Sequence, residues 1–228
     1  MITFTNEDCM IGMARYPDKY FQLAIVDPPF REVNDPLPCM RNGSNNKHAV
    51  RKEILNINKP PDTAYFSELM RVSKNQIVHG GNYFTAFLPP NNNWIIWYKN
   101  NDGVGFSMAE LFWSSIVRNV KLLDMRPMGL NGDKIHPTQK PVALYKWLLT
   151  NYAKPGDKIL DTHVGSASSL IACHDMGFDA VGFELDADYY KASKQRLEDF
   201  MRQPRLDSID ISNREQVELF GRPDYGKP

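Results

Sequence analysis

Short apolar runs recur along the chain, and helical patterns separate most of them. We expect strands at seven of these runs: 2–5, 23–26, 76–80, 94–98, 120–125, 158–162 and 180–184. We expect helices near 62–73, 82–88, 141–153, 167–176 and 187–203. Strands that alternate with helices predict crossover connections and an α/β fold, with helices on both faces of a mostly parallel sheet. A chain of 228 residues buries such a core without needing a disulfide or a metal ion as a staple.

Composition excludes several classes and leaves one question to charge distribution. Lys+Arg and Asp+Glu both number 27, so net charge argues neither for nor against a nucleic-acid partner. The three cysteines form no CxxC pair, which favours a reducing compartment over a secreted disulfide framework. The start MITFTNEDCM lacks the pattern of a signal peptide, and no apolar run is long enough to span a membrane. We therefore expect a cytoplasmic protein.

Three stretches interrupt the rhythm of strands and helices: 31–60, 99–134 and the tail 204–228. A structureless segment of about 30 residues in a compact domain is usually a functional loop or disordered. The first stretch carries an excess of cations, namely Arg31, Arg41, Lys47, Arg51, Lys52 and Lys59, against Glu32, Asp35 and Glu53. That excess fits either a solvated surface loop or a loop that faces DNA. We expect one domain over 1–203 and a tail over 204–228.

The stretch KILDTHVGSASSLIACHDMGFDAVGFELD (158–186) has the order strand, Gly-containing turn, helix, strand. Gly165 allows a sharp turn, and the helix after it presents free N–H groups at its positive end. Glu184, at the end of the second strand, is placed to accept hydrogen bonds from a ribose diol. The stretch therefore indicates a nucleoside site, although a strand followed by a capped helix is the simpler alternative.

This nucleoside site does not have the pattern of a dinucleotide site. The GxGxxG fingerprint requires glycines where the chain has Ala167 and Ser168. Asp161, at the end of the first strand, would repel a pyrophosphate. The same carboxylate suits a cationic amine, such as the α-amino group of S-adenosylmethionine.

A second feature is LAIVDPPF (23–30), in which a buried strand ends in an acid, two prolines and an aromatic residue. Each proline fixes its own φ, and the residue before a proline is kept out of the helical region. Asp27 and the Pro28 carbonyl then form two adjacent acceptors with no competing N–H group between them. Two acceptors suit an –NH₂ group, and Phe30 supplies a flat face for a heterocycle. The stretch predicts a clamp for an exocyclic amine on an aromatic base.

Together, DPPF (27–30), HPTQKP (136–141) and DTHVGSA (161–167) resemble motifs of the DNA amino-methyltransferases, which modify adenine N6 or cytosine N4. The clamp (27–30) comes before the turn implied to bind the cofactor (161–167), as in the circularly permuted β group of that family. NEDC (6–9), GGNYF (80–84), WIIWYKN (94–100) and AELFWSS (109–115) resemble further segments of small phage and prophage members. The resemblance implies a circularly permuted, Rossmann-like methyltransferase fold with a seven-stranded sheet. In that fold, strand 2–5 lies beside strand 180–184.

The resemblance also implies roles for individual residues. The catalytic residues are Asp27, Pro28, Pro29 and Phe30. The cofactor S-adenosylmethionine is contacted by Asp8, Cys9, His136, Thr138, Lys140, Asp161, Gly165, Ser166 and Glu184. DNA is contacted by Arg31, Arg41, Lys47, Arg51, Lys52 and Lys99. No metal ion is expected. Three positions depart from the family pattern, namely Tyr98, His163 and Ala167.

The implied activity is methyl transfer from S-adenosylmethionine to adenine N6 in double-stranded DNA, after the base has been flipped out of the helix. A second aromatic residue, Tyr83, Phe84 or Trp113, is expected to stack on the flipped base with Phe30. Cytosine-N4 methylation on the same scaffold and a non-catalytic DNA-binding or cofactor-sensing module are the alternatives. Protein-glutamine and RNA amine methyltransferases share a related clamp but usually place the cofactor turn before it. The loops 31–60 and 99–134 are expected to face DNA, and such a small reading region is compatible with a short recognition sequence or a dimer. The resemblance also implies the cytoplasm of a bacterium or of a phage-infected cell.

The tail contains QVELF (216–220), which resembles the pentapeptide that binds the bacterial sliding clamp. Gln216, Leu219 and Phe220 match its anchor positions. The segment therefore predicts a tether to the replication clamp. The alternative is a short helix that docks on its own domain.

Overall fold

The structure is a computed structural model that describes residues 1–30, 59–101, 107–127, 135–136 and 138–203. Its strands are β1 (Ile2–Asn6), β2 (Phe21–Val26), β3 (Ser73–His79), β4 (Trp94–Tyr98), β5 (Ala109–Ser114), β6 (Lys121–Asp124), β7 (Lys158–Asp161) and β8 (Asp179–Glu184). Its helices are α1 (Cys9–Met13), α2 (Thr63–Val72), α3 (Val142–Tyr152), α4 (Ser168–Asp175) and α5 (Ala187–Met201), with a 3₁₀ turn at η2 (Gly81–Tyr83).

The strands form one sheet in the order β1-β8-β7-β2-β3-β5-β4-β6. All pairings are parallel except the two made by β5, which is antiparallel to β3 and to β4. The prediction of a mostly parallel α/β sheet is confirmed, but the number of strands is wrong, because the described sheet has eight strands and not seven. The strand absent from the prediction is β5, which lies within the turn-rich stretch 99–134.

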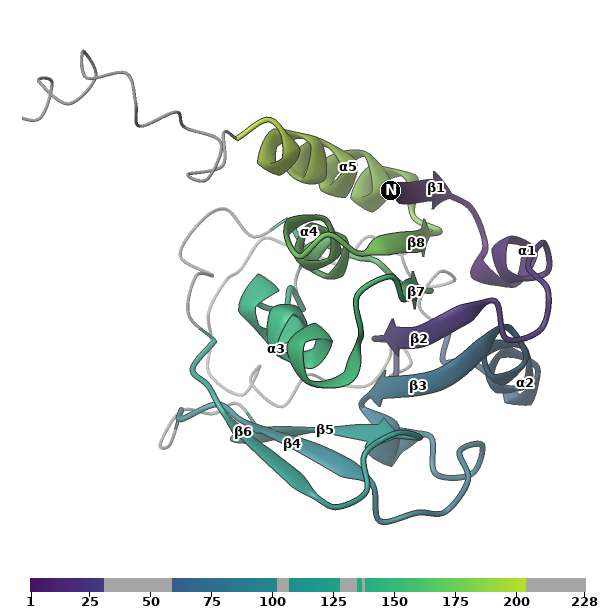
Figure 1. Cartoon of the computed structure of the whole chain (residues 1–228), viewed down its shortest axis with the longest axis vertical. Helices are drawn as coiled ribbons and strands as arrows, with labels where there is room; N and C mark the ends of the chain where they lie inside the picture. The colour runs from purple at the N-terminus through teal and green to yellow at the C-terminus, as the bar shows by residue number, and fades with distance from the viewer. Residues whose placement is uncertain (31–58, 102–106, 128–134, 137, 204–228) are drawn as a thin grey trace, which may run out of the picture.

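Helices cover both faces of the sheet, and β2 shows why the sequence requires this (Figure 1). Leu23 and Ile25 join the core that is shared with α3, α4 and α5. Ala24 and Val26, which point to the opposite face, join the core that is shared with α1 and α2. A strand with both faces buried reads as an unbroken apolar run, which is how LAIV looks in the sequence.

The pairing expected from the permuted order is confirmed. Strand β1 lies parallel to β8 at the edge of the sheet, in the register Ile2↔Ala180 to Asn6↔Glu184. Helix α5 packs on the same edge, where the Tyr190 hydroxyl donates to the Phe4 carbonyl at 3.3 Å. The first and last described elements of the chain therefore complete the sheet together.

Two local expectations differ from the structure. The helix expected over 82–88 is only the 3₁₀ turn η2, because the backbone leaves the helical conformation at Phe84 (φ −115°, ψ 20°). Helix α1 was missed because five residues are too few to show a helical period; Asp8 caps it by accepting from the Met10 N–H at 2.7 Å.

Several predicted residues lie outside the described part of the chain. They are Arg31, Arg41, Lys47, Arg51 and Lys52, and in the tail Gln216, Leu219 and Phe220. Their predicted contacts with DNA and with the sliding clamp stay predictions. Among the described helices, none combines the length and the apolar character that crossing a membrane requires.

Candidate active site

Four carboxylates follow four parallel strands at one edge of the sheet. Asp161 ends β7, Glu184 ends β8, Asp27 follows β2 and Asp8 lies just beyond β1. These strands are neighbours in the order β1-β8-β7-β2, so their carboxyl ends meet at the same edge. In open α/β sheets, ligands bind at this edge. The fold thus gathers the predicted cofactor residues and the predicted clamp from distant parts of the chain.

The turn after β7 is fastened to the end of β8. Gly165 adopts φ 55° and donates its N–H to Glu184 Oε2 at 2.8 Å, while the Val164 N–H donates to the Phe183 carbonyl at 3.0 Å. Ala167 begins α4 in a left-handed conformation (φ 61°), which a residue with a Cβ rarely adopts. The turn therefore has the conformation that two glycines would take, with alanine in the place of the second.

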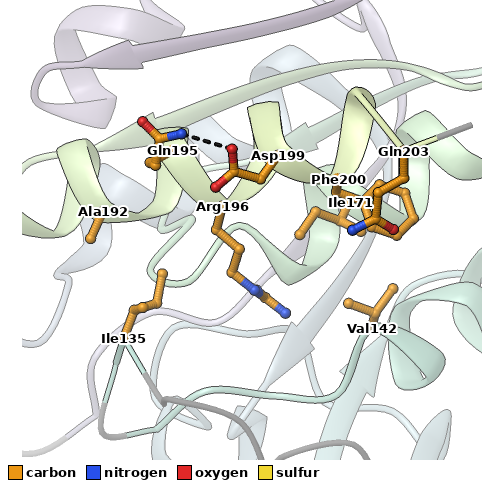
Figure 2. A pocket seen from close by; sticks show the side chains of 9 residues that line it. All are labelled: Ile135, Val142, Ile171, Ala192, Gln195, Arg196, Asp199, Phe200 and Gln203. Atoms are coloured by element: carbon orange, nitrogen blue, oxygen red, sulfur yellow. Dashed lines mark hydrogen bonds between the residues drawn. The ribbon is translucent and has the colours of Figure 1, made fainter.

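Arg196 of α5 also holds the turn after β7 through hydrogen bonds. Its Nη1 donates to the Ser166 carbonyl and to Ser168 Oγ, the latter at 3.0 Å. Figure 2 shows Arg196 at an open pocket of about 420 Å³ between α3, α4 and α5. None of the residues predicted to bind cofactor or base lines this pocket, so Arg196 acts on the site by holding the Ser166 backbone.

Asp161 is buried and forms no salt bridge with any residue in the described part of the chain. Its carboxylate accepts from Ser169 Oγ and from the His163 N–H, the latter at 3.0 Å. Burial raises the pKa of Asp161 to about 7, and these two hydrogen bonds offset the effect only in part. A cationic amine arriving at this carboxylate would favour its charged form.

The segment that leads into Asp8 and Cys9 is joined to Glu184, because the Glu7 N–H donates to the Glu184 carbonyl at 3.1 Å. Glu184 Oε1 accepts from the Asp186 N–H at 3.0 Å, and burial raises the pKa of Glu184 above its usual value. The Asn6 side chain donates to the Glu184 carbonyl at 2.8 Å and so joins the end of β1 to the end of β8. Burial also raises the pKa of Cys9 to about 12, so Cys9 carries a neutral thiol that suits contact with an uncharged ring.

His136 and Thr138 lie across from the glycine turn. A Cβ added at Gly165 would lie 3.8 Å from the His136 ring, and the ring packs against Tyr189 with centroids 4.5 Å apart. Burial lowers the pKa of His136, so the ring is neutral. Its Nδ1 then accepts from the Thr138 N–H at 3.3 Å and lies 3.0 Å from the Thr138 hydroxyl.

Asp27 is held by cations on both carboxylate oxygens. Its Oδ1 contacts His79 Nδ1, and its Oδ2 accepts from Lys140 Nζ at 2.9 Å. Burial by itself raises the pKa of Asp27, but the charges of His79 and Lys140 outweigh burial and hold the pKa well below its usual value. Lys140, which was predicted to lie beside the cofactor, thus contacts the clamp acid as well as the Thr138 carbonyl at 3.3 Å.

The network continues through Glu110 of β5. His79 Nε2 contacts Glu110 Oε2, and Lys99 Nζ donates to Glu110 Oε1 at 2.8 Å. Lys99 is therefore paired inside the protein, and its predicted contact with DNA stays a prediction. Sequence reasoning missed His79 and Glu110; the only available signal was a polar residue in each of two otherwise apolar runs, QIVHG and AELFW.

Phe30 presents an aromatic face beside the clamp. Its ring stacks on Tyr83 with centroids 4.3 Å apart and an interplanar angle of 6°. Tyr83 is 52% exposed, whereas the other two expected stacking residues, Phe84 and Trp113, are buried in the core next to α2. The expectation is therefore wrong for Phe84 and Trp113, because their rings pack the domain interior.

Comparisons with known proteins bear on the family pattern and on the fold. Residues 108–195 match a protein-family model, N6_N4_Mtase, which is described as DNA methylase. The type II methyltransferase M.HpaI of Haemophilus parainfluenzae is 35% identical over 77 residues, which are 34% of this chain and 24% of that protein. YubD of Escherichia coli (strain K12) is 35% identical over 76 residues, which are 33% of this chain and 34% of that protein. The matched region thus spans only a quarter to a third of these relatives.

Solved structures resemble nearly the whole chain. The complex of M1.HpyAVI with SAM has a TM-score of 0.58 at 20% identity and covers 86% of this chain and 99% of its own. TTHA0409 from Thermus thermophilus with S-adenosyl-L-methionine has a TM-score of 0.57 at 17% identity, with 90% and 98% covered. The PvuII DNA methyltransferase (cytosine-N4-specific) has a TM-score of 0.56 at 13% identity, with 87% and 92% covered. The fold is therefore the Rossmann-like fold of DNA methyltransferases, and residues 108–195 carry the pattern of the DNA methylase family.

Proposed function

We propose that this chain transfers a methyl group from S-adenosylmethionine to the N6 amino group of adenine in DNA. The observation that carries the proposal is the position of Asp27 and Pro28 next to Asp161, on adjacent parallel strands at the carboxyl edge of the sheet. An amine acceptor and a nucleoside site then face the same space. The match of residues 108–195 to a DNA methylase family supports the same activity.

The residues of the turn have the chemistry to bind the cofactor. Asp161 would supply a buried carboxylate for its α-amino group, Glu184 would accept from the ribose hydroxyls, and Asp8 and Cys9 would border its adenine. Gly165 leaves the backbone uncovered at the point of closest approach, while His136 lies across from it. When bound, S-adenosylmethionine supplies an electrophilic methyl group on a sulfonium.

Asp27 and the Pro28 carbonyl would accept hydrogen bonds from the two N–H groups of the target amine. These hydrogen bonds favour a pyramidal nitrogen with its lone pair directed away from the ring. Alignment of that nitrogen with the methyl group at about 3–3.5 Å gives a near-attack geometry. Positive charge that develops on the nitrogen would be stabilised by the Asp27 carboxylate until the nitrogen loses one proton to solvent, while the sulfonium would become a neutral thioether as its methyl group leaves. The low pKa of Asp27 suits this role, since the residue must stay charged and need not be a strong base.

The target amine must share Asp27 with its present partners. A carboxylate has about four lone-pair positions, and His79 and Lys140 occupy one on each oxygen. The amine therefore takes a free position on one oxygen or displaces the ammonium of Lys140. Phe30 and Tyr83 stack beside this point and offer a surface that would offset part of the cost of flipping the base, since stacking contributes about 1–3 kcal/mol per base.

Methyl transfer to DNA tests the proposal directly. Purified protein is incubated with labelled S-adenosylmethionine and DNA of mixed sequence, and the digested nucleosides are separated. We expect N6-methyladenine from the wild type and none above background from Asp27→Ala. The control is Asp18→Ala, which removes an exposed carboxylate paired with Arg71 and leaves the product unchanged. Equal backgrounds from the wild type and Asp27→Ala would contradict the enzyme and support a non-catalytic DNA-binding or cofactor-sensing module.

Cytosine-N4 methylation is the second candidate, because a structural neighbour of this chain carries cytosine-N4 specificity in its name and the matched family model covers both N6 and N4 methylation. The nucleoside separation distinguishes the two products in the same experiment. A label in N4-methylcytosine, and none in adenine, would replace the proposed substrate while leaving the chemistry of the clamp intact.

A further inference from the structure

A buried charged network lies behind Asp27, and the proposed mechanism gives no role to its centre, His79. The side chain of His79 is 5% exposed and packs against Phe112 with ring centroids 4.6 Å apart. Its Nδ1 contacts Asp27 Oδ1, and its Nε2 contacts Glu110 Oε2. Both ring nitrogens of one buried histidine are thus engaged by acids from the strands on either side of β3.

These contacts determine the protonation state of the ring. An ionised carboxylate only accepts hydrogen bonds, so each ring nitrogen must carry a proton to donate one. Burial by itself lowers the pKa of His79, but Asp27 and Glu110 outweigh burial and raise it above the usual value. Glu110 stays charged, because its contacts with His79 outweigh burial and hold its pKa at about 2. The ring is therefore an imidazolium between two carboxylates.

Other ionisable groups near the ring also affect its protonation state. Within the described residues, the other ionisable groups that interact with the ring or its two acids are Lys99 after β4, Lys140 before α3, Tyr145 on α3, and Tyr65, His136, Asp161 and His163 near Asp27. Lys140 opposes the charge on the ring but lies 2.9 Å from Asp27 and 3.9 Å from Glu110, so it is neutralised by the same acids.

We propose that His79, held as an imidazolium by Glu110, is a positioning residue that orients the Asp27 carboxylate and keeps it anionic during methyl transfer. This role rests on the function proposed above. His79 fixes Oδ1 of Asp27 and leaves the Oδ2 side for the target amine, and Glu110 fixes the ring in turn. Groups that orient a reacting residue in this way tune both its geometry and its charge.

The role predicts a pH profile of a definite sign. The imidazolium is present below the raised pKa of His79, so the turnover rate falls as the pH rises through that value. Protonation of Asp27 should not lower the turnover rate near neutral pH, because the pKa of Asp27 is held far below its usual value. Removing the imidazolium removes one of the two cations on Asp27, which raises its pKa and moves the acid limb to higher pH.

Two variants separate the hydrogen bond from the charge. In His79→Asn the side-chain amide lies near the place of Nδ1 and still donates to Asp27, but it cannot titrate. In His79→Gln the amide lies near the place of Nε2 and loses the bond to Asp27. A hydrogen bond to a charged group contributes about 1.5–3 kcal/mol, so His79→Gln should lower kcat roughly 10- to 100-fold. His79→Asn should lower it less and should lose the alkaline limb.

The measurements are kcat and KM against pH, with cofactor binding by titration as the check on folding. KM for S-adenosylmethionine should stay within about twofold of the wild type in both variants, because His79 acts on the amine side. Glu110→Gln is the second test if a His79 variant fails to fold; it should move the alkaline limb to lower pH. His174→Asn, on α4, is the control and should change neither the rate nor the profile.

The outcomes separate this role from the proposed function. If the wild type methylates DNA but the His79 variants keep its rate and its alkaline limb, the role of His79 is overturned and the function stands. If the wild type transfers no methyl group, the function fails and this role fails with it. Histidine-selective ¹⁵N spectra give an independent reading, because a His79 ring that is neutral at pH 6 would overturn the imidazolium.

Discussion

At the scale of single residues, two neighbouring carboxylates have opposite electrostatic surroundings. Asp27 has cations on both oxygens, and its pKa is held far below the usual value. Asp161 has only neutral donors, and burial raises its pKa to about 7. Environments that separate two acids in this way assign them different tasks. Asp27 is charged at all relevant pH values, whereas Asp161 becomes fully charged when a cation binds.

Asp161 therefore makes cofactor binding depend on pH. Below its pKa of about 7 the carboxyl is protonated and must lose that proton to bind an ammonium. Affinity for S-adenosylmethionine should fall as the pH falls, by up to about tenfold per pH unit. Calorimetric titration between pH 5.5 and 7 measures this effect. The control ligand is 5′-methylthioadenosine, which lacks the amine and should bind with constant affinity. A flat profile for S-adenosylmethionine would contradict the pairing of Asp161 with its amine.

At the scale of elements, short apolar runs predicted seven of the eight described strands, both central strands and edge strands. LAIV, in β2, is apolar without interruption because helices bury both of its faces. Strand β5 was not predicted, since it starts with Ala-Glu, residues that are depleted in strands, and follows the turn-rich NNDGVG. Its antiparallel pairing with β3 brings Glu110 to His79, so the missed strand is also the reason that the network was missed.

Substitution of the two left-handed residues of the turn after β7, Gly165 and Ala167, should change the free energy of unfolding by different amounts. Ala167→Gly relieves about 1–2 kcal/mol of backbone strain. It also removes a buried methyl group, which costs about 0.8 kcal/mol. It increases the conformational entropy of the unfolded chain as well, which costs about 0.5–1 kcal/mol. The free energy of unfolding should therefore change by less than about 1 kcal/mol. Gly165→Ala introduces backbone strain with no compensating gain and should lower the free energy of unfolding by about 1–2 kcal/mol. Urea denaturation measures both, and an equal loss in the two variants would contradict the assignment of strain.

The close contact between η2 and β5 should make Gly81 intolerant of any side chain. A Cβ at Gly81 would lie 2.4 Å from the Cβ of Trp113 and 2.8 Å from its backbone nitrogen. Overpacking of this kind costs about 1–3 kcal/mol, and backbone must move to relieve it. Gly81→Ala should therefore lower the melting temperature and the methyl-transfer rate. Gly177→Ala is the control for backbone strain alone, because a Cβ there has no atom within 4 Å although φ is 77°. A smaller loss in Gly81→Ala than in Gly177→Ala would contradict this contact.

At the scale of the whole molecule, the sequence predicted which segments form the site but not how they touch. The motif order predicted that β1 lies beside β8, which places Asp8 near Glu184. The motifs did not show that Lys140 reaches Asp27, a contact between residues 113 positions apart. Such a contact depends on the path of the chain before α3, which no local pattern encodes. Side-chain partners across elements were therefore the part that sequence alone could not supply.

The division of the chain into a catalytic domain and a tail gives a further test. All residues proposed to bind cofactor or base precede Gln203, the last described residue. A chain that ends at 203 should keep cofactor binding and methyl transfer, and should lose any affinity for the bacterial sliding clamp. Full-length Phe220→Ala is the matched variant, with the same expected loss of clamp affinity and no change in activity. Clamp binding that survives both changes would remove the proposed tether, while lost activity in the shortened chain would contradict the domain boundary.

All the proposed chemistry lies at the carboxyl edge of the sheet, and the turns at the opposite edge offer points of attachment within the described residues. The turns that enter β7 and β8 at that edge contain Gly156 and Gly177, and a Cβ at either has no atom within 4 Å. A peptide tag inserted at Gly156 would tether the protein to a solid support with its working side facing outward. Immobilised protein could then be exposed in turn to different DNA fragments, so that its preferred sequence is read from what it retains.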